Sequence, residues 1–427
     1  MQTVSLITGK TLLKLMKLTG HGGSALPGLV IEKTDPQFLA RSLAKLPKGV
    51  VIVSGTNGKT TTTKTIADLL EGQGLKVLTN KSGSNFVRGI ISTLAKRTKL
   101  NGQLPYDIAV FEQDEAHAVR FADLVKPNGV VVLNVLRDQL DRFGEIDTTA
   151  KHLQKLVTAA KDFVVLNGND ERVGNLHPQA GVNTFMFGHS EELQSNFLSD
   201  DEFHSVRSPV YKLAGQLFCE LRSYDDKSVS LKINGQTKSY TTELNGSHNW
   251  INLAAAVTTV LAILPDVNSK KLENSIRGLK PAFGRGESFT LDNGSQITLQ
   301  LVKNPASFSH NLRNHSLYSG KTVGIAINDD YPDGRDVSWL YDVDFSNLKS
   351  AKDGVVCAGT RGYDMAVRLK YDDVAVQEVA EELGKFVESV TRAANGGPAT
   401  IFCTYTAMLK IRAIFKKKHK AVGGIEL

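Results

Sequence analysis

The sequence predicts an α/β protein built on a parallel sheet with helices on both faces. From about residue 48, short runs rich in β-branched residues alternate with stretches of helical periodicity. Strands that are separated by helices in this way form parallel, doubly wound sheets. A chain of 427 residues also has room for two or three domains. We therefore expect a phosphate-loop domain over residues 1–289 and a second, Rossmann-like α/β domain over residues 290–427.

The first strands and helices are predicted in chain order. Residues 50–54 predict a buried strand because they are almost entirely β-branched. Residues 60–71 predict a helix, since their apolar residues fall on one face and glycines follow. Further strands are expected at residues 75–79, 107–111, 129–133 and 162–166.

The pattern changes between residues 188 and 243, where short polar and apolar stretches alternate around turn signals such as Asn234-Gly235. We expect a small β-rich insertion there. Helical periodicity returns at residues 249–263. The second domain is then expected to use strands at residues 295–302, 322–328, 354–358 and 399–403, with helices between them.

Charge and cysteine content narrow the possible partners. The net charge of +7 and the pI near 9.0 favour anionic partners such as nucleotides, phosphorylated lipids or a membrane surface. Cys219, Cys357 and Cys403 are far apart and form no CxxC pair, which argues against a disulfide framework or a thiolate zinc site. We expect no zinc and a reducing, cytoplasmic location.

One segment near the N-terminus has the composition of a membrane-surface helix. No apolar run is long enough to span a bilayer, and Lys10, Lys14 and Lys17 interrupt the apolar residues that a signal peptide would need. Residues 6–18 could form a basic amphipathic helix. Such a helix either packs on its own domain or lies peripherally on an anionic membrane surface.

The strongest local signal is a glycine-rich turn between the strand at 50–54 and the following helix. Glycines let backbone N–H groups approach phosphate oxygens, and the helix N-terminus adds partial positive charge. Lys59 can reach the terminal phosphates of ATP, and the Thr60 hydroxyl can ligate Mg²⁺. The residues expected to bind nucleotide here are Gly55, Thr56, Asn57, Gly58, Lys59, Thr60 and Thr61.

The spacing GxxGKT, followed by further threonines, resembles the Mur ligase and folylpolyglutamate synthase superfamily. The resemblance implies that Glu112, at the end of the strand at 107–111, binds Mg²⁺ together with Thr60. It also implies that Asn249, in the stretch GSHNWIN, contacts adenine, and that Arg285, in GRGE, contacts phosphate or ribose. An amide offers one donor and one acceptor to adenine, and a guanidinium is always charged.

The chain departs from this superfamily at two places. Gln139 stands where the family's stretch Asn…Asp-His-x-Asp-Arg has a metal-associated His, and a Gln carbonyl approaches Mg²⁺ more weakly. The amino-acid-adding members also carry a carbamylated lysine further on. The matching positions here are Leu153 and Gln154, whereas Lys151 and Lys155 are out of step. The missing lysine argues against a standard amino-acid ligase.

Several further segments resemble the MurT branch, the ligase-like subunits of lipid II isoglutaminyl synthases. They are residues 26–28, 141–147, 303–306, 333–339, 341–345, 359–361 and 405–406. MurT proteins often carry a four-cysteine zinc ribbon, but the region at 188–243 holds only Cys219.

The MurT resemblance implies a complete reaction. A heterodimeric partner, a GatD-like glutamine amidotransferase, releases ammonia from glutamine. The present chain uses ATP and Mg²⁺ to phosphorylate the α-carboxylate of the D-glutamate in lipid II, and ammonia converts the acyl phosphate to D-isoglutamine. Lys59 and Glu112 would serve catalysis at the phosphates, and Asp336 would complete a Cys-His-Asp set in the partner. Otherwise Asp336 is a turn residue.

Two alternatives remain open at this point. One is another Mur-superfamily ligase, of folylpolyglutamate or muropeptide type, that joins an amino acid to a carboxylate. The other is a phosphate-loop nucleotide-binding subunit that performs no ligation, which Asn249, Arg285 and the last domain disfavour. Neither reading requires nucleic acid as a partner.

Overall fold

The computed structural model describes residues 10, 25–80, 86–136, 146–197, 211–225, 227–242, 244, 246–280, 285–418 and 422–423. The chain forms two compact units. Unit 1 comprises Met1–Val135 and Ile146–Lys280, and unit 2 comprises Leu136–Glu145 and Pro281–Leu427. Within the described ranges, no helix has the length and apolarity required to cross a membrane. The segment at residues 6–18, expected to form a basic helix, lies outside the description except for Lys10.

Unit 1 is built on one nine-stranded sheet in the order β2-β3-β1-β4-β5-β6-β7-β8-β9. The strands from β2 to β7 run parallel, and β8 and β9 add an antiparallel edge. Their bounds are β1 Val50–Ser54, β2 Val77–Leu78, β3 Ile108–Glu112, β4 Gly129–Val132, β5 Phe163–Asn167, β6 Asn183–His189, β7 Cys219–Tyr224, β8 Ser228–Ile233 and β9 Gln236–Thr241.

The strands between residues 183 and 241 continue the main sheet instead of forming a body of their own. β6 pairs in parallel with β5, from Phe163 opposite Asn183 to Asn167 opposite Phe187. β7 then pairs with β6, and the β8–β9 hairpin completes the edge. The sequence pattern correctly indicated β structure for β7, β8 and β9. Most of β6 lies before the predicted segment, which begins at residue 188, and its hydrogen bonds to β5 leave no local signature.

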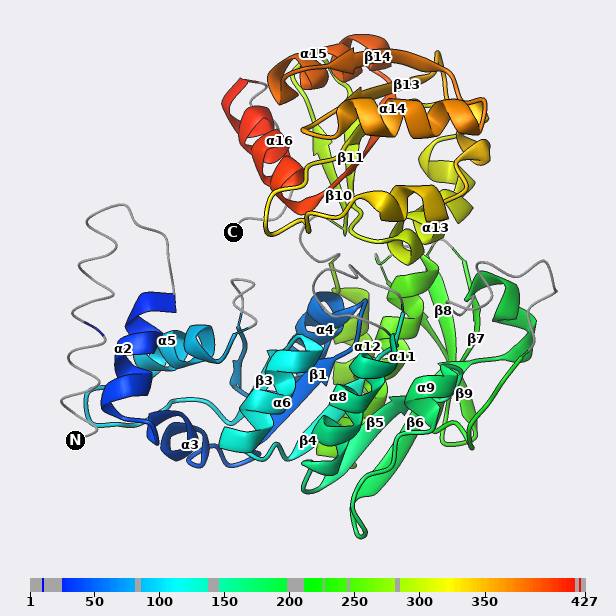
Figure 1. The fold of residues 1–427 in the computed structure, drawn as a ribbon. Helices are drawn as coiled ribbons and strands as arrows, with labels where there is room; N and C mark the ends of the chain where they lie inside the picture. Colours follow the sequence, from blue (N-terminus) through cyan, green and yellow to red (C-terminus); the bar gives the residue numbers. More distant parts are fainter. Residues whose placement is uncertain are drawn as a thin grey trace. The chain divides into compact units, whose positions relative to one another are not determined.

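Helices cover both faces of this sheet (Figure 1). One face packs against α2 (Ala25–Thr34), α3 (Phe38–Leu43), α5 (Val87–Arg97), α6 (Glu115–Leu124) and α8 (Ile146–Thr158). The other packs against α4 (Lys59–Gly72), α11 (Ser247–Ile263) and α12 (Ser269–Arg277). The short elements α9 (Glu171–Gly174) and η1 (Glu191–Asn196) complete the described helices of unit 1.

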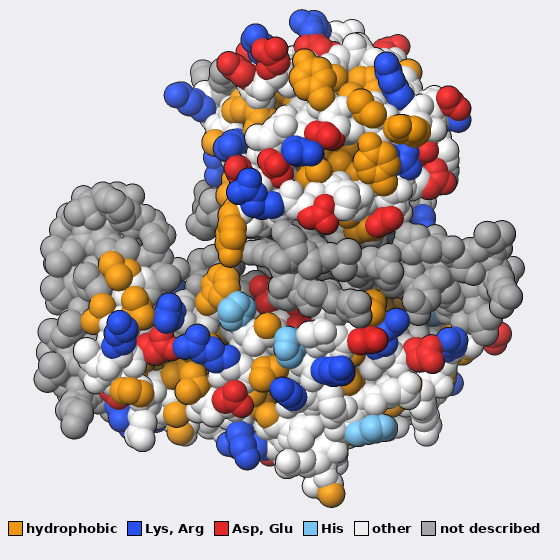
Figure 2. All heavy atoms as spheres, in the orientation of Figure 1, with side chains coloured by type: hydrophobic (Ala, Val, Ile, Leu, Met, Phe, Trp, Pro, Cys, Tyr) orange, Lys and Arg blue, Asp and Glu red, His pale blue; other side chains and the backbone are white. Residues whose placement is uncertain are grey.

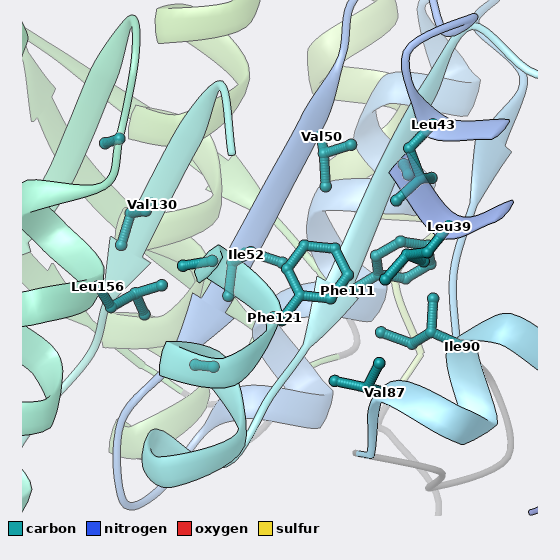
Figure 3. Close-up of a cluster of buried hydrophobic side chains, with 14 of the residues drawn as sticks. Leu39, Leu43, Val50, Ile52, Val87, Ile90, Phe111, Phe121, Val130 and Leu156 are labelled. Atoms are coloured by element: carbon teal, nitrogen blue, oxygen red, sulfur yellow. The ribbon is translucent and has the colours of Figure 1, made fainter. Parts of the chain in front are cut away.

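Side chains along a strand alternate between the two faces of a sheet, so the β1 residues are divided between two hydrophobic clusters, one on each face. Val50 and Ile52 pack with Phe111 and Phe121 in one cluster (Figure 3), whereas Val51 and Val53 belong to the cluster under α4 and α11. Both faces of β1 are therefore buried, as its unbroken β-branched run predicts. β1 ends at Ser54, and the glycine-rich turn begins at Gly55.

Unit 2 contains a seven-stranded sheet in the order β14-β13-β12-β15-β11-β10-β16. Its strands are β10 Arg285–Thr290, β11 Gln296–Leu301, β12 Thr322–Ala326, β13 Val355–Ala358, β14 Val376–Ala380, β15 Pro398–Cys403 and β16 Val422–Gly423. β10 is antiparallel to both β11 and β16, and the other pairs are parallel. The helical elements are α13 Pro305–Arg313, η2 His315–Leu317, η3 Ser338–Asp342, η4 Ser346–Ser350, α14 Gly362–Tyr371, α15 Leu383–Ala394 and α16 Tyr405–Lys418.

A buried ion pair joins β10 to α16 in unit 2. The Arg412 guanidinium lies 2.7 Å from the Glu287 carboxylate, with the two side chains only 4% and 1% exposed. Arg412 also stacks near the Phe289 ring. Glu287 is the last residue of the GRGE motif, so this end of the motif anchors a strand inside unit 2.

We expect Glu287→Ala to lower the free energy of unfolding by about 3–5 kcal/mol, because it leaves the Arg412 charge buried without its partner. Urea unfolding followed by circular dichroism would measure the loss. Arg392→Ala is the matched control. Its ion pair with Glu378 is 76% and 40% exposed, and exposed pairs contribute below about 1 kcal/mol. Equal losses in the two variants would contradict the prediction.

Candidate functional site

At two positions, the turn at residues 55–58 has a backbone conformation that only glycine adopts without strain. Gly55 and Gly58 have φ angles of 124° and 89°, in the left-handed region. A Cβ on Gly58 would lie 2.5 Å from Asn252 Oδ1, and one on Gly55 would lie 2.9 Å from the Asn134 carbonyl oxygen. The turn therefore passes so close to Asn134 and Asn252 that neither position has room for a side chain.

Asn134 clamps this turn from the adjacent strand. The Asn57 N–H donates to Asn134 Oδ1 at 2.8 Å, and Asn134 Nδ2 donates to the Asn57 carbonyl at 3.1 Å. The Thr56 N–H donates to the Asn134 carbonyl at 3.0 Å. Asn134 follows β4, which is the direct neighbour of β1. Asn134 is the first residue of the stretch that resembles the family's Asn…Asp-His-x-Asp-Arg motif, but no contact with this turn was predicted for it.

Lys59 begins α4 and folds back over the turn. Its Nζ donates to the Gly55 carbonyl at 2.6 Å and to the Thr56 carbonyl at 3.3 Å, and lies 3.2 Å from Asp114 Oδ1. The ammonium is thereby held in position before any phosphate arrives. Asp114, which precedes α6, is a second residue that the sequence analysis missed. Thr60 is exposed at the second position of α4, whereas Thr61 is buried.

Glu112 ends β3 beside the turn. It pairs in register with Val53 of β1, and its side chain is almost completely buried. Asn80 fixes its backbone, because the Glu112 N–H donates to Asn80 Oδ1 at 3.0 Å and Asn80 Nδ2 donates to the Glu112 carbonyl at 2.9 Å. The carboxyl ends of parallel strands meet at one edge of the sheet, so Glu112 and the turn share the ligand-binding edge.

The donor set suits Mg²⁺ bound together with a nucleotide. Mg²⁺ is usually held by one or two carboxylates plus substrate phosphates and water. Glu112 supplies a carboxylate and Thr60 a hydroxyl at this edge. Among the described residues, no three or more His, Cys, Asp or Glu side chains are placed to share a metal ion. Gln139, considered as a weak metal ligand, lies outside the described residues.

The start of α11 reaches the same turn. Asn249 and Asn252 are both buried in the first turns of this helix, and Asn252 is the side chain that approaches Gly58. The fold therefore brings the stretch GSHNWIN next to the phosphate loop, although almost two hundred residues separate the two in the sequence. Asn249 belongs to the first turn of α11, the helix that packs on α4.

We expect Gly58→Ala to weaken ATP binding by about tenfold or more while β1 and α4 remain folded. An added Cβ strains a positive φ, which costs about 1–3 kcal/mol, and it meets the Asn252 amide. Equilibrium titration with a fluorescent ATP analogue would measure the change. Gly74→Ala is the control for strain alone, because Gly74 also has positive φ but no atom within 4 Å of its Cβ position. Equal losses in ATP affinity for both variants would contradict this account.

Arg285 and Asp336 belong to unit 2. The Arg285 backbone begins β10, and a register shift at Gly286 separates it from Glu287; its side chain is outside the description. Asp336 lies between β12 and η3 and is partly exposed. One of its carboxylate oxygens accepts the Ser338 N–H at 2.8 Å, as in the Asx turns that aspartate favours.

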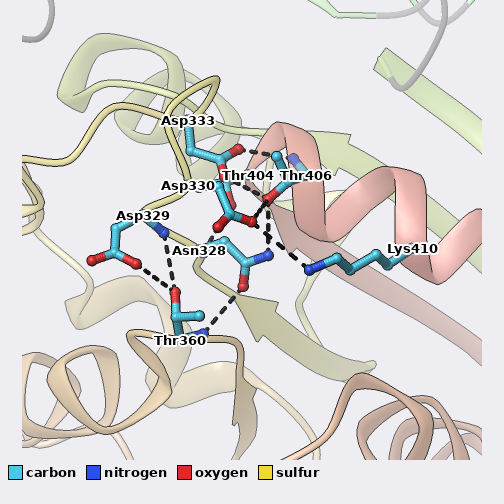
Figure 4. Close-up of polar contacts among 8 residues, drawn as sticks. All are labelled: Asn328, Asp329, Asp330, Asp333, Thr360, Thr404, Thr406 and Lys410. Carbon is cyan, nitrogen blue, oxygen red and sulfur yellow. Dashed lines mark hydrogen bonds and ion pairs between the residues drawn. The ribbon is translucent and has the colours of Figure 1, made fainter. Parts of the chain in front are cut away.

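Asp333, only three residues before Asp336, has a different environment. It is buried, and both the N–H and the hydroxyl of Thr406 donate to its carboxylate (Figure 4). Desolvation raises the pKa of Asp333. Asn328 extends this network by donating to the Thr406 hydroxyl at 2.9 Å. Asp333 thus holds its segment against the start of α16, whereas Asp336 stays partly exposed on the same segment.

The three cysteines are buried and are not disulfide-bonded. Burial raises the pKa of Cys219 and Cys357 to about 12, and it raises that of Cys403 as well. Burial therefore disfavours the thiolate form of all three side chains near neutral pH.

Profiles of known domains match two parts of the chain. The Mur ligase middle domain matches residues 53–260, and the MurT ligase C-terminal domain matches residues 301–408. The chain is 28% identical to the lipid II isoglutaminyl synthase (glutamine-hydrolyzing) subunit MurT of Staphylococcus aureus (strain COL), over 86% of this chain and 87% of that protein. It is 29% identical to the subunit of the same name in Streptococcus pneumoniae (strain ATCC BAA-255 / R6), over 98% and 97%.

Solved structures share the fold. The MurF ligase from Thermotoga maritima in complex with ADP superposes with a TM-score of 0.68 at 17% identity, covering 91% of this chain and 84% of that chain. A pseudomurein peptide ligase type C from Methanothermus fervidus gives a TM-score of 0.67 at 18% identity, with the same coverage. At these identities the likeness concerns the fold alone.

Proposed function

The chain belongs to the Mur ligase family and carries a MurT-type C-terminal domain, and from this premise we propose that it is the ligase subunit of a lipid II isoglutaminyl synthase. In this proposal, ATP phosphorylates the α-carboxylate of the D-glutamate in lipid II. Ammonia then attacks the acyl phosphate, phosphate leaves, and D-isoglutamine forms. The support is the similarity to two MurT subunits over 86% and 98% of the chain, together with the phosphate loop. In this loop Lys59 pairs with Asp114, two residues after the strand end that carries Glu112.

Each residue of the nucleotide site has a role in this proposal. The backbone of residues 55–58 surrounds the phosphates, and Lys59 stabilises the negative charge that develops on the transferring phosphoryl group. Glu112 and Thr60 would hold Mg²⁺, which when bound neutralises charge on the phosphate oxygens. Asn249 would bind adenine, and Arg285 would contact phosphate or ribose. An anionic carboxylate becomes a usable electrophile only because phosphorylation provides it with a leaving group.

The nucleophile in this proposal is ammonia from a glutaminase partner. Ammonia needs less positioning than an amino acid, which agrees with Leu153 and Gln154 at the positions where amino-acid-adding relatives have a modified lysine. Asp336 would enter the partner's active site and orient its catalytic His. Its partial exposure, next to the buried Asp333, leaves a carboxylate on the surface for such a contact.

The test is phosphate release that requires two substrates together. Purified chain, glutamine amidotransferase and ATP should release phosphate only when both glutamine and a lipid-linked muropeptide are present. Mass spectrometry should show amidated product in the same reaction. A product that carries a newly joined amino acid instead of an amide would indicate another Mur-type ligase. Nucleotide binding without any ligated product would indicate a binding subunit. Either result would overturn the proposal.

We expect amidation to require Mg²⁺ and not zinc. Removing divalent ions with EDTA should abolish turnover, and added Mg²⁺ should restore it, because the charge on ATP is otherwise uncompensated. A zinc-selective chelator should leave the rate unchanged. Elemental analysis that finds one zinc per chain, with activity lost on chelation, would contradict this expectation.

A further inference from the structure

One face of α14 exposes an apolar stripe. Tyr363, Val367 and Tyr371 are 65%, 49% and 72% exposed, and their spacing of four residues places them on one side of the helix. The stripe is about 12 Å long at a rise of 1.5 Å per residue. The opposite side of α14, with Met365 and Leu369, is buried in the core of unit 2.

Tyr341 of η3 widens this stripe. It is 56% exposed, and its ring centroid lies 6.1 Å from that of Tyr371. We call Tyr341, Tyr363, Val367 and Tyr371 the tyrosine stripe. Figure 2 shows hydrophobic side chains gathered on the face of unit 2 where Figure 1 draws α14.

The buried Arg368 locks the two parts of the stripe together. From α14 it donates to the carbonyls of Leu340 and Val343 on either side of Tyr341, and its guanidinium lies 5.8 Å from the Tyr341 ring. Arg368 also forms an ion pair of 2.8 Å with Asp372, which helps to hold its side chain in place. The stripe is thus one preformed surface, which reduces the entropy lost on binding.

The tyrosine stripe is continuous with the segment that carries Asp336. Ser338, the first residue of η3, donates to Asp336, and five residues of chain reach at most about 17 Å. A protein interface of ordinary size covers about 800 Å² on each partner, which is a patch of roughly 16 Å radius. A protein that brings its active site to Asp336 is therefore wide enough to cover Tyr341 and the neighbouring stripe.

We propose that the tyrosine stripe is the docking surface for the glutaminase subunit, with Asp336 at the edge of the same interface. This inference rests on the proposed function, which requires a partner at Asp336. Tyrosines supply large contact area at low entropic cost and are enriched among residues that dominate binding. The partner face that fits the stripe is an apolar groove beside its catalytic His, with polar groups for the tyrosine hydroxyls.

The test compares two double variants of the full chain. Tyr363→Ser/Tyr371→Ser should weaken binding of the same organism's glutamine amidotransferase subunit by about 30-fold or more in isothermal titration calorimetry. Leu100→Ser/Leu124→Ser is the matched control, since it removes two side chains of unit 1 that are similarly exposed. The control should bind the partner as the wild type does.

Activity assays separate failure of the inference from failure of the proposed function. The stripe variant should keep amidation supported by added ammonium and lose amidation supported by glutamine until the partner concentration is raised. Normal partner binding by the stripe variant would overturn the inference and leave the function standing. A change in self-association instead of partner binding would assign the surface to a second copy and also overturn it. A wild-type chain that neither binds the partner nor amidates would overturn the proposed function.

Discussion

Lys59→Ala should lower ATP turnover by about 10²–10³-fold while the chain remains folded. In the structure the ammonium is already held by the Gly55 and Thr56 carbonyls and by Asp114, so it needs little reorganisation when phosphate binds. Removing such a preorganised charge has this magnitude of effect on the chemical step. Phosphate release in the presence of the partner, glutamine and lipid substrate measures the loss.

Lys64→Ala provides the control for this prediction. Lys64 lies on the same helix, one turn and a half further along, and pairs with Asp68 at the surface. Its removal should leave turnover unchanged. Glu112→Gln should match Lys59→Ala in turnover and should also raise the Mg²⁺ concentration needed, since an amide is a weaker ligand than a carboxylate. Near-normal turnover by folded Lys59→Ala would refute the assignment of this loop.

Asp336→Asn should remove glutamine-dependent amidation but leave ATP binding intact. An amide cannot stabilise a protonated His and favours the wrong tautomer, an effect that reaches about 10⁴ in enzymes with an Asp-oriented His. We expect a loss of at least about 10² in glutamine hydrolysis by the complex. Added ammonium should restore amidation to Asp336→Asn but not to Lys59→Ala, because only the ammonia supply is impaired.

Asp344→Asn is a close control for Asp336→Asn. Asp344 is exposed and accepts the Ser346 N–H at 2.9 Å, the same turn geometry that joins Asp336 to Ser338 at 2.8 Å. Hydrogen bonds from Ser346 also lower the pKa of Asp344. If the two variants hydrolyse glutamine equally well, Asp336 is a turn residue and the partner's catalytic set is completed elsewhere.

Local sequence patterns predicted much of the fold. The strand at β1 and the helix α4 were confirmed almost to the residue, and the strands β3, β4, β5, β12, β13 and β15 lie where they were expected. These segments were predictable because β-branched runs, glycine stops and helical periodicity act within a few residues. β14 and β10 were missed, since VQEVA and RGESFT are partly polar and have no strong alternation.

The strand, the glycine turn and the helix of the phosphate loop, with Lys59 at the helix start, could be predicted from local sequence. The reason is that left-handed φ angles, β-branching and helical period are properties of neighbouring residues. The distant residues that complete the site are set by tertiary packing. Asn134, Asp114 and Asn252 reach the turn because β4, β3 and α11 pack beside β1 and α4. Strand order and helix packing depend on burial over the whole unit, and no short segment encodes them.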